Sequence, residues 1–126
     1  MKRAIATDSA PKAVGPYSQA IAIGQFLFCA GQIPLDPTTG ELVGADALTQ
    51  TKRVCENIGG VLAANGMTFA DIVKTTVFLA TMDDFAAMNT VYARYFPEPF
   101  PARSTVAVAA LPRGAKVEIE VIAAKA

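Results

Sequence analysis

Histidine is absent from the 126-residue sequence, and cysteine occurs only twice. Imidazole is the usual general base for Ser or Cys nucleophiles and the commonest ligand of transition metals in proteins. The composition therefore argues against Ser–His or Cys–His catalysis and against a zinc site. Cys29 and Cys55 each stand in an apolar segment, so we expect buried thiols rather than nucleophiles or a disulfide. Any catalysis must use carboxylate, guanidinium, hydroxyl or backbone groups.

The sequence also lacks a net charge, because 11 basic residues balance 11 acidic ones. No long-range field therefore favours nucleic acid, an anionic membrane or an acidic partner. The glycine-rich patterns GxGxxG and GxxxxGK[ST], which cradle nucleotide phosphates, are missing as well. Nucleic-acid binding is consequently a minority interpretation.

Long apolar runs are missing too. The first residues carry two basic side chains, as a signal peptide does, but Asp8, Pro11 and Lys12 interrupt the stretch that should be apolar. No window reaches the roughly 18 consecutive apolar residues that a membrane-spanning helix needs. We therefore expect a soluble protein with a cytoplasmic location.

The sequence does contain enough apolar material for one packed core, because 52% of its residues are hydrophobic. We expect a single domain over residues 1–126. Runs of apolar and β-branched residues predict strands, and apolar residues at helical spacing predict helices. The predicted strands cover residues 20–24, 26–33, 72–82, 104–112 and 116–124, and the predicted helices cover residues 46–64 and the segment from Asp83 or Asp84 to about Tyr95.

The first predicted helix has recognisable ends. Asp46 suits the N-cap position, and Asn65 followed by Gly66 forms a C-terminal stop. Gly59 and Gly60 lower the helix propensity of the interior by roughly 1 kcal/mol per residue relative to Ala. Tertiary packing must therefore hold this helix, and we expect its backbone to lie close to the sheet at the glycine pair.

The order of the elements fits an α+β domain with two helices on one face of a mixed sheet. In the last strand, Val117 and Ile119 point to one face, whereas Glu118, Glu120 and Ile122 point to the other. Neither face is purely polar, so a sheet with helices on one side needs another covering layer. We predict that self-association provides this layer and that the protein is a homo-oligomer.

Arg103 is the one charged residue in the small and apolar run FPARSTVAVAALP. Prolines fix the chain before it, so we expect the guanidinium to emerge at the start of a strand with little bulk nearby. Its planar fork can hold a carboxylate through two parallel hydrogen bonds, a geometry that lysine cannot reproduce. A surface salt bridge with a neighbouring Asp or Glu is the alternative, and residue type alone does not decide between them.

Glu118 and Glu120 supply carboxylates. A Glu in a partly apolar setting can have a raised pKa and act as a general acid or base toward water, although both can equally be ordinary strand residues facing solvent. If the last two strands formed a hairpin about Arg113, Arg103 and Glu118 would stand about five residues, or ~16 Å, apart at ~3.3 Å per residue. One small substrate cannot span that distance. If both residues serve one site, either these strands are not neighbours or the two side chains come from different subunits.

Four long motifs occur in order along the chain: IATDSAPKAVGPYSQAI, AGQIPLDPTTGELVG, DIVKTTVFLATMDDFAAMNTVYARYF and FPARSTVAVAALPRGAKVEIEVIAA. Through them nearly the whole sequence closely resembles the reactive-intermediate deaminase family (Rid or YjgF-type), in its RidA branch. The resemblance implies a chorismate-mutase-like α+β fold and a homotrimer with clefts between subunits. It also implies hydrolysis of 2-imino acids and their enamine tautomers, such as 2-aminoacrylate, to 2-keto acids and ammonia, with no metal or organic cofactor.

The resemblance also assigns site residues. Arg103 matches the family's carboxylate-binding Arg, and Glu118 matches its water-positioning Glu. Tyr17 matches the aromatic residue that closes the cleft, and Gly31 matches a residue that offers its backbone carbonyl to the imine nitrogen. Asn89 matches a further residue near the site.

Two positions depart from the family pattern. Thr105 stands where deaminating members often have Cys, and Ala30 stands where many have Ser. A thiol-dependent mechanism is therefore excluded, but the backbone N–H of Thr105 can still bind a substrate carboxylate. We expect the two changes to alter pocket shape, rate and substrate range more than the chemistry.

Two other functions stay open at this point. A non-catalytic carboxylate-binding trimer, acting as a metabolite sensor or holdase, would need Arg103 but not Glu118. Ribonuclease or translation-inhibitor activity has been attached to relatives of this family. Phosphate contacts need clustered Lys or Arg, however, and the sequence has no basic stripe with interleaved aromatic residues.

Overall fold

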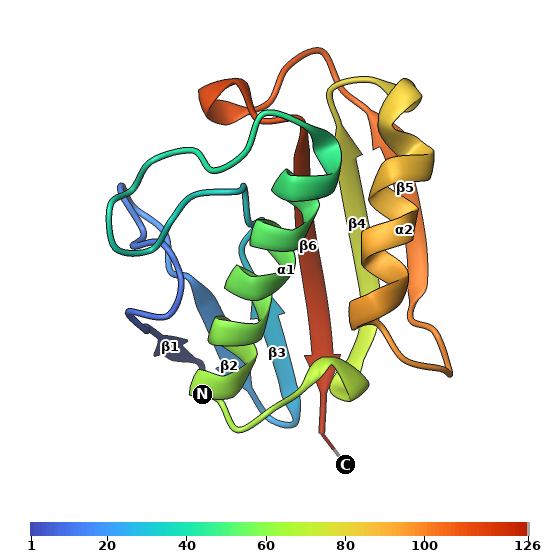
Figure 1. Ribbon diagram of the computed structural model, residues 1–126. Helices are drawn as coiled ribbons and strands as arrows, with labels where there is room; N and C mark the ends of the chain where they lie inside the picture. The colour runs from blue at the N-terminus through green and yellow to red at the C-terminus, as the bar shows by residue number, and fades with distance from the viewer. Residues whose placement is uncertain (126) are drawn as a thin grey trace.

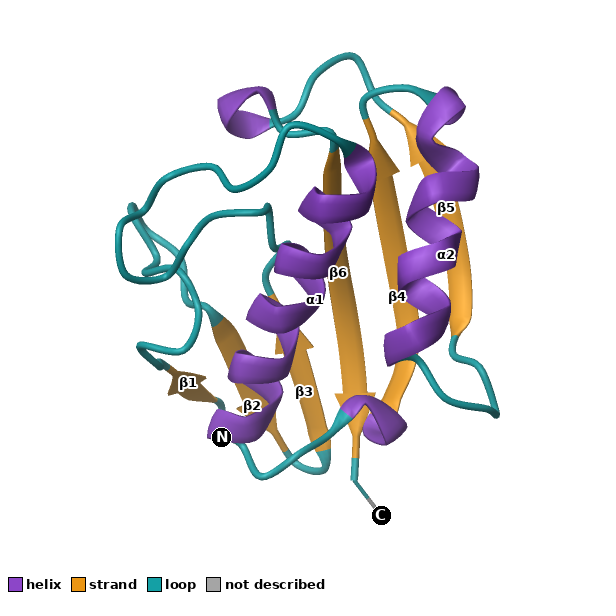
Figure 2. Ribbon diagram, in the orientation of Figure 1, coloured by secondary structure: helices purple, strands orange, loops and turns teal. Residues whose placement is uncertain are grey.

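The computed structural model describes residues 1–125 of the chain. One six-stranded sheet forms its centre, and two helices lie together on one face of this sheet (Figure 1, Figure 2). The strands are β1 (Arg3–Ile5), β2 (Ala20–Ile23), β3 (Phe26–Cys29), β4 (Ile72–Leu79), β5 (Ala102–Ala107) and β6 (Val117–Ala124). The helices are α1 (Ala47–Ala64) and α2 (Phe85–Tyr95), with 3₁₀ turns η1 (Phe69–Asp71), η2 (Met82–Asp84) and η3 (Pro112–Gly114). The predicted α+β class and the position of both helices are confirmed.

The strands follow the order β1-β2-β3-β6-β4-β5. Neighbouring strands are antiparallel except β4 and β5, which run parallel and are connected through α2. Strand β4 therefore lies between β5 and β6, and the hairpin considered for the last two strands does not form. The tight turn between β2 and β3 is present, with Gly24 at a φ of 55°, where glycine is favoured.

Alternation along β6 separates the two faces of the sheet. Val117, Ile119 and Val121 are buried beneath the helices, where they join the main apolar core with residues of α1. Glu118 and Glu120 point to the other side, as the sequence predicts. Side chains along β6 thus alternate between the core and the opposite face of the sheet.

The face of the sheet without helices, called the open face below, carries several large apolar side chains. Phe26 and Phe28 on β3 are 39% and 43% exposed, and Val106 on β5 is 45% exposed. Several exposed apolar side chains on one face of a sheet are typical of surfaces that contact another protein. The open face therefore agrees with the expectation that this chain self-associates.

Residues 6–18, called the strap below, connect β1 to β2 without forming helix or strand and pass beside α1 (Figure 1). At their closest approach, a Cβ atom on Gly60 would overlap the backbone carbonyl oxygen of Ser9. Gly59 instead faces the Phe69 ring, 3.3 Å from the position of a Cβ. The prediction that the glycine pair lies against the sheet is wrong, because the strap and η1 occupy that space.

Several predicted ends of helices and strands are confirmed, and others lie at different residues in the structure. Asp46 caps α1 by accepting the Thr49 N–H, and Asn65 ends the helix. Strand β3 ends at Cys29, although the next residue, Ala30, still donates its N–H to the Gln19 carbonyl at 2.9 Å. The predicted strand over 26–33 is therefore too long.

The region around α2 also differs from the sequence-based prediction. Strand β4 ends at Leu79, before the predicted residue 82, because Thr81 caps the turn η2 by accepting the Asp83 N–H. Asp84 stands at the N-cap of α2 but makes no capping hydrogen bond. Strand β5 starts directly after Pro101 and ends at Ala107, earlier at both ends than the predicted 104–112. A short strand β1, which has too few residues to show a pattern, was not predicted.

Candidate functional site

Arg103 is the second residue of β5, the edge strand beside α2 (Figure 2). The parallel register places it opposite Thr75, which is 1% exposed and shares a 2.8 Å hydrogen bond with the hydroxyl of Tyr92 on α2. Residues aligned in a sheet share a face, so Arg103 points to the helix side. Pairing with β4 thus positions the guanidinium against α2.

Side chains from α2 surround the guanidinium. One of its nitrogens, Nη1, donates to Oδ1 of Asn89 at 2.7 Å. The Cζ atom lies 4.8 Å from the ring centroid of Tyr92 and 5.6 Å from that of Phe85. These rings attract the cation without neutralising it. The one ion pair among residues 1–125 joins Arg53 to Glu56. The surface salt bridge considered for Arg103 therefore does not form.

A cavity of about 330 Å³ opens beside Arg103. It is lined by Asn89, Tyr92, Ala93, Phe100, Pro101 and Arg103. Its size is in the range of small-molecule pockets, and its lining combines apolar groups with one cation and one amide. The cavity is suited to a small organic acid whose carboxylate meets the guanidinium.

Thr105 lies two residues beyond Arg103 on the same face of β5. The N–H of Val108 bonds to the carbonyl of Leu79 on β4 at 2.9 Å. Because peptide groups alternate along a strand, the N–H groups of Arg103 and Thr105 point away from β4 to the free edge of the sheet. The hydroxyl of Thr105 is buried and has no hydrogen-bond partner within the described chain. The N–H of Thr105 at the free edge is thus available to a ligand, whereas its hydroxyl is enclosed.

Glu118 on β6 lies on the open face and is half-buried. Burial raises the pKa of its carboxyl, and the nearby negative charge of Glu120 raises it further. The carboxylate packs against Gly31, where an added Cβ would overlap a carboxylate oxygen and lie 3.0 Å from Cδ of Glu118. Glycine at position 31 is therefore required for Glu118 to take this position.

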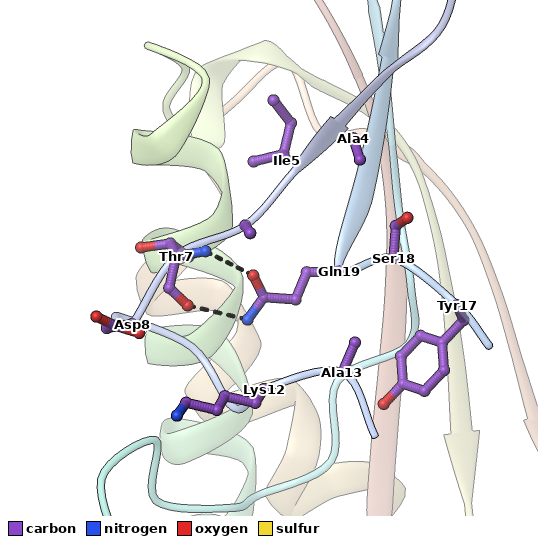
Figure 3. Close-up of a pocket in the computed structure, with 10 residues that line it drawn as sticks. Ala4, Ile5, Thr7, Asp8, Lys12, Ala13, Tyr17, Ser18 and Gln19 are labelled. Carbon is purple, nitrogen blue, oxygen red and sulfur yellow. Dashed lines mark hydrogen bonds between the residues drawn. The ribbon is translucent and has the colours of Figure 1, made fainter. Parts of the chain in front are cut away.

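Tyr17 and Gly31 line one small cavity of about 70 Å³, next to Glu118. The ring of Tyr17 is 55% exposed, and its hydroxyl accepts the Val14 N–H at 3.4 Å. Tyr17 stands near the end of the strap, two residues before Gln19 (Figure 3). These three residues form one group, which we call the glutamate half-site.

The six predicted site residues thus fall into two groups on one protomer. The glutamate half-site is on the open face, and the arginine half-site, made of Arg103, Asn89 and Thr105, is on the helix face. The register places Glu118 opposite Phe78, and Phe78 opposite Val106, so Glu118 and Arg103 are also offset along the strands. The sheet itself lies between them, and a small molecule cannot contact both within one protomer.

Sequence reasoning assigned Phe85 and Tyr92 to the helix pattern and missed that they surround Arg103. The signal was present, because residues 85, 89 and 92 recur at helical spacing and share one side of α2. Phe100 was missed as well, since a residue between prolines gives no periodic pattern. Cys29 and Cys55 are buried and unbonded to each other, as predicted, and burial raises the pKa of each thiol to about 12.

No cluster of His, Cys, Asp or Glu side chains that could bind a metal ion occurs among residues 1–125. Over the same residues, neither helix has the length and apolar character needed to cross a membrane.

Comparison with known proteins identifies relatives along the whole chain. A family model described as Endoribonuclease L-PSP matches residues 7–125. A RutC family protein of Pyrococcus horikoshii is 55% identical, and the alignment covers 99% of both chains. The 2-iminobutanoate/2-iminopropanoate deaminase of Capra hircus is 46% identical over 98% of this chain and 90% of its own length.

Solved structures agree with these sequence matches. The crystal structure of E. coli TdcF with bound serine superposes with a TM-score of 0.93 at 42% identity, covering 98% of this chain and 99% of the other. The likeness extends over fold and sequence together, including the segments that carry both half-sites. This chain therefore belongs to the reactive-intermediate deaminase family, whose model is described as Endoribonuclease L-PSP.

Proposed function

We propose that this protein hydrolyses 2-imino acids and their enamine tautomers to 2-keto acids and ammonia, in clefts that form between subunits of a homotrimer. The observation that carries this proposal is the division of one chemically complete set of groups between the two faces of the sheet. The named deaminase relative supports the reaction, and the bound serine in TdcF supports a ligand with an α-carboxylate.

A second copy of the chain supplies the missing half of each cleft. The open face carries exposed Phe26, Phe28 and Val106, which need a covering layer, and it also carries Glu118. Association that covers this face can bring the glutamate half-site of one protomer to the arginine half-site of its neighbour. Each substrate then lies between a guanidinium and a carboxylate from different subunits.

The arginine half-site binds the substrate carboxylate. Asn89 holds one nitrogen of Arg103, so the remaining N–H groups of the fork are oriented toward the cavity. The outward N–H of Thr105 donates a further hydrogen bond to the carboxylate. Because the rings of Phe85 and Tyr92 attract the cation without neutralising it, the guanidinium keeps its charge for the ligand.

Glu118 moves the protons of the reaction. As a carboxylate it takes a proton from water while the water oxygen attacks the C=N carbon, and it passes that proton to the imine nitrogen to give a carbinolamine. Glu118 then takes the hydroxyl proton of the carbinolamine and delivers it to the leaving nitrogen as the C–N bond breaks and the C=O bond forms, so one imine and one water give one keto acid and one ammonia. Because the pKa of Glu118 is raised by burial and by Glu120, its carboxylate accepts a proton more readily than that of an ordinary Glu.

The other residues position the substrate. The carbonyl of Gly31 accepts a hydrogen bond from the imine nitrogen, Asn89 orients Arg103, and Tyr17 closes the cleft over the bound molecule. Holding the C=N carbon beside an oriented water supplies most of the rate increase, because imines hydrolyse readily once the reactants are placed.

The test couples the protein to a serine or threonine dehydratase and measures keto acid and ammonia release above the spontaneous rate. We expect Arg103→Ala to lose the acceleration while remaining folded, and Glu118→Gln to lose it while still binding a 2-keto acid. Arg94→Ala on α2, which removes an exposed Arg outside the arginine half-site, is the matched control and should keep wild-type activity.

Two results would redirect the assignment. If Glu118→Gln retained full activity, or the wild-type chain bound 2-keto acids without accelerating hydrolysis, a carboxylate-binding sensor or holdase would be the better description. If RNA bound with a steep dependence on salt, the endoribonuclease activity that the family description names would be favoured.

A further inference from the structure

We infer that Gln19 is a positioning residue of the glutamate half-site, holding the strap so that Tyr17 is placed over the cleft. This inference rests on the proposed function, because it concerns the same reaction. It assigns a role to a side chain that lies beside the half-site and that none of the proposed steps uses.

The carboxamide of Gln19 is fully engaged with the strap (Figure 3). Its Oε1 accepts the N–H of Thr7 at 2.7 Å. Its Nε2 donates to the carbonyl oxygens of Thr7, Ala10 and Pro11 at 3.0, 3.2 and 2.7 Å. Only a carboxamide combines an acceptor with two donors in this arrangement, and Asn is one carbon too short to reach the same atoms. Gln19 is 4% exposed, so these bonds are shielded from water.

The backbone of Gln19 continues the connection toward Glu118. Its carbonyl accepts the N–H of Ala30 at 2.9 Å, and Ala30 precedes Gly31, against which Glu118 packs. Gln19, Tyr17 and Gly31 line the same small cavity. One residue therefore ties the strap to the segment that supports the catalytic carboxylate.

The strap needs such a tie because it has no strand or helix of its own. The hydroxyl of Tyr17 is held by a long contact of 3.4 Å to the Val14 N–H, which belongs to the strap itself. Irregular segments with few buried contacts open at low free-energy cost. Without the amide of Gln19, the strap would move away from its site, and Tyr17 would close the cleft less often.

Gln19→Met tests the inference, because methionine keeps the length and apolar volume but removes the hydrogen bonds. The matched control is Gln50→Met. Gln50 is 2% exposed and also bonds backbone groups, donating to the Gly44 carbonyl at 3.0 Å and accepting the Lys116 N–H at 2.8 Å, but it does not touch the strap. Both variants are assayed well below their melting temperatures, so that unfolding does not contribute.

We expect kcat/KM for the imine to fall about tenfold or more in Gln19→Met and to stay within about twofold of wild type in Gln50→Met, because misplaced groups lose rate steeply. In a Tyr17→Ala background, Gln19→Met should cost less than about twofold, since the residue that it positions is already gone. Wild-type kcat/KM in Gln19→Met, equal losses in both Met variants, or full additivity with Tyr17→Ala would each overturn the inference.

Amide hydrogen exchange provides a second readout that does not depend on activity. Exchange over residues 6–18 should be at least about tenfold faster in Gln19→Met and unchanged in Gln50→Met. If the wild-type chain proved inactive toward imines, the proposed function and the catalytic role of Gln19 would both fail. Faster exchange confined to Gln19→Met would then still show that the amide holds the strap, so the two failures can be distinguished.

Discussion

At the scale of single residues, the surroundings of Arg103 explain why the guanidinium is available to a ligand. Its nearest partners are one amide and two aromatic rings, and its hydrogen bond to Asn89 uses a single nitrogen. A carboxylate in the same place would have formed a closed ion pair. The remaining donors of the fork therefore stay open to an incoming acid.

Arg103→Lys tests the planar fork directly. Lysine keeps the charge but cannot form two parallel hydrogen bonds, so we expect kcat/KM to fall by about tenfold to a hundredfold, equivalent to about 1.5–3 kcal/mol. Steady-state kinetics at fixed ionic strength would measure this. Arg94→Lys should have no effect, and unchanged kinetics in Arg103→Lys would show that charge alone is enough.

Glu118 gives a prediction on pH dependence. Burial and Glu120 raise the pKa of Glu118, so the activity that needs its carboxylate form should decline, as pH falls, at a higher pH than for an ordinary Glu. Glu120→Gln removes one of these causes and should shift the acid limb of the kcat/KM profile to lower pH. A limb that stayed in place would show that another group controls it.

Glu118 should also affect stability, but here its protonated form is the favoured one, whereas activity needs its carboxylate form. Because the pKa of Glu118 is raised in the folded chain, the folded state binds its proton more tightly than the unfolded state does. Its contribution to stability is therefore present below the ordinary Glu pKa and is lost as pH rises through the raised value. Glu118→Gln should be more stable than wild type at neutral pH but not at acidic pH, as measured by urea unfolding at both.

At the scale of elements, α1 shows how one position in a helix can serve a segment outside it. Gly60 costs helix propensity, but its missing side chain leaves space for the strap at Ser9. Gly59, one residue earlier, faces the edge of the flexible Phe69 ring instead. The two neighbouring glycines are therefore not equivalent.

Gly60→Ala should destabilise the chain by about 1–3 kcal/mol, because the new methyl group meets backbone that cannot move freely. Gly59→Ala should be neutral or stabilising by up to about 1 kcal/mol, because the ring can shift and Ala favours helix. Urea unfolding of both variants measures the difference. Equal effects would show that the strap does not restrict position 60.

At the scale of the whole molecule, the sheet separates the two half-sites, so the proposed function requires that subunits assemble. The open face carries apolar residues together with Glu118, which places the surface expected to associate next to the carboxylate that we propose to be catalytic. A monomer would present two incomplete sites. Sedimentation at micromolar concentration should therefore give a trimer.

Subunit mixing tests whether the sites are shared. Arg103→Ala and Glu118→Gln chains, each inactive alone, should regain about a quarter of wild-type activity when refolded together in equal amounts, because random assembly pairs an intact arginine with a neighbour's intact glutamate at that frequency. Mixing each variant with itself is the control. No recovery in a mixed trimer would place both residues in one protomer's site.

The sequence alone determined the local features of this protein. Periods of two and 3.6 residues depend on neighbouring side chains, so both helices, most strands, the caps of α1 and the alternation that exposes Glu118 could be predicted from it. Charge balance and the absence of histidine limited the chemistry, and the motifs indicated the site residues. Each of these properties depends on residues that are close together in the sequence or on composition.

Only the tertiary structure decided which segments meet. Contacts between distant segments place β4 between β5 and β6, and they turn Arg103 toward α2 while Glu118 faces the open side. Contacts of the same kind bring Gly60 and Gln19 against the strap. Such contacts form when the whole chain packs, and the spacing of apolar residues within one segment does not predict them. The identity of the chemical groups was therefore local information, whereas their division between two faces was a property of the folded sheet.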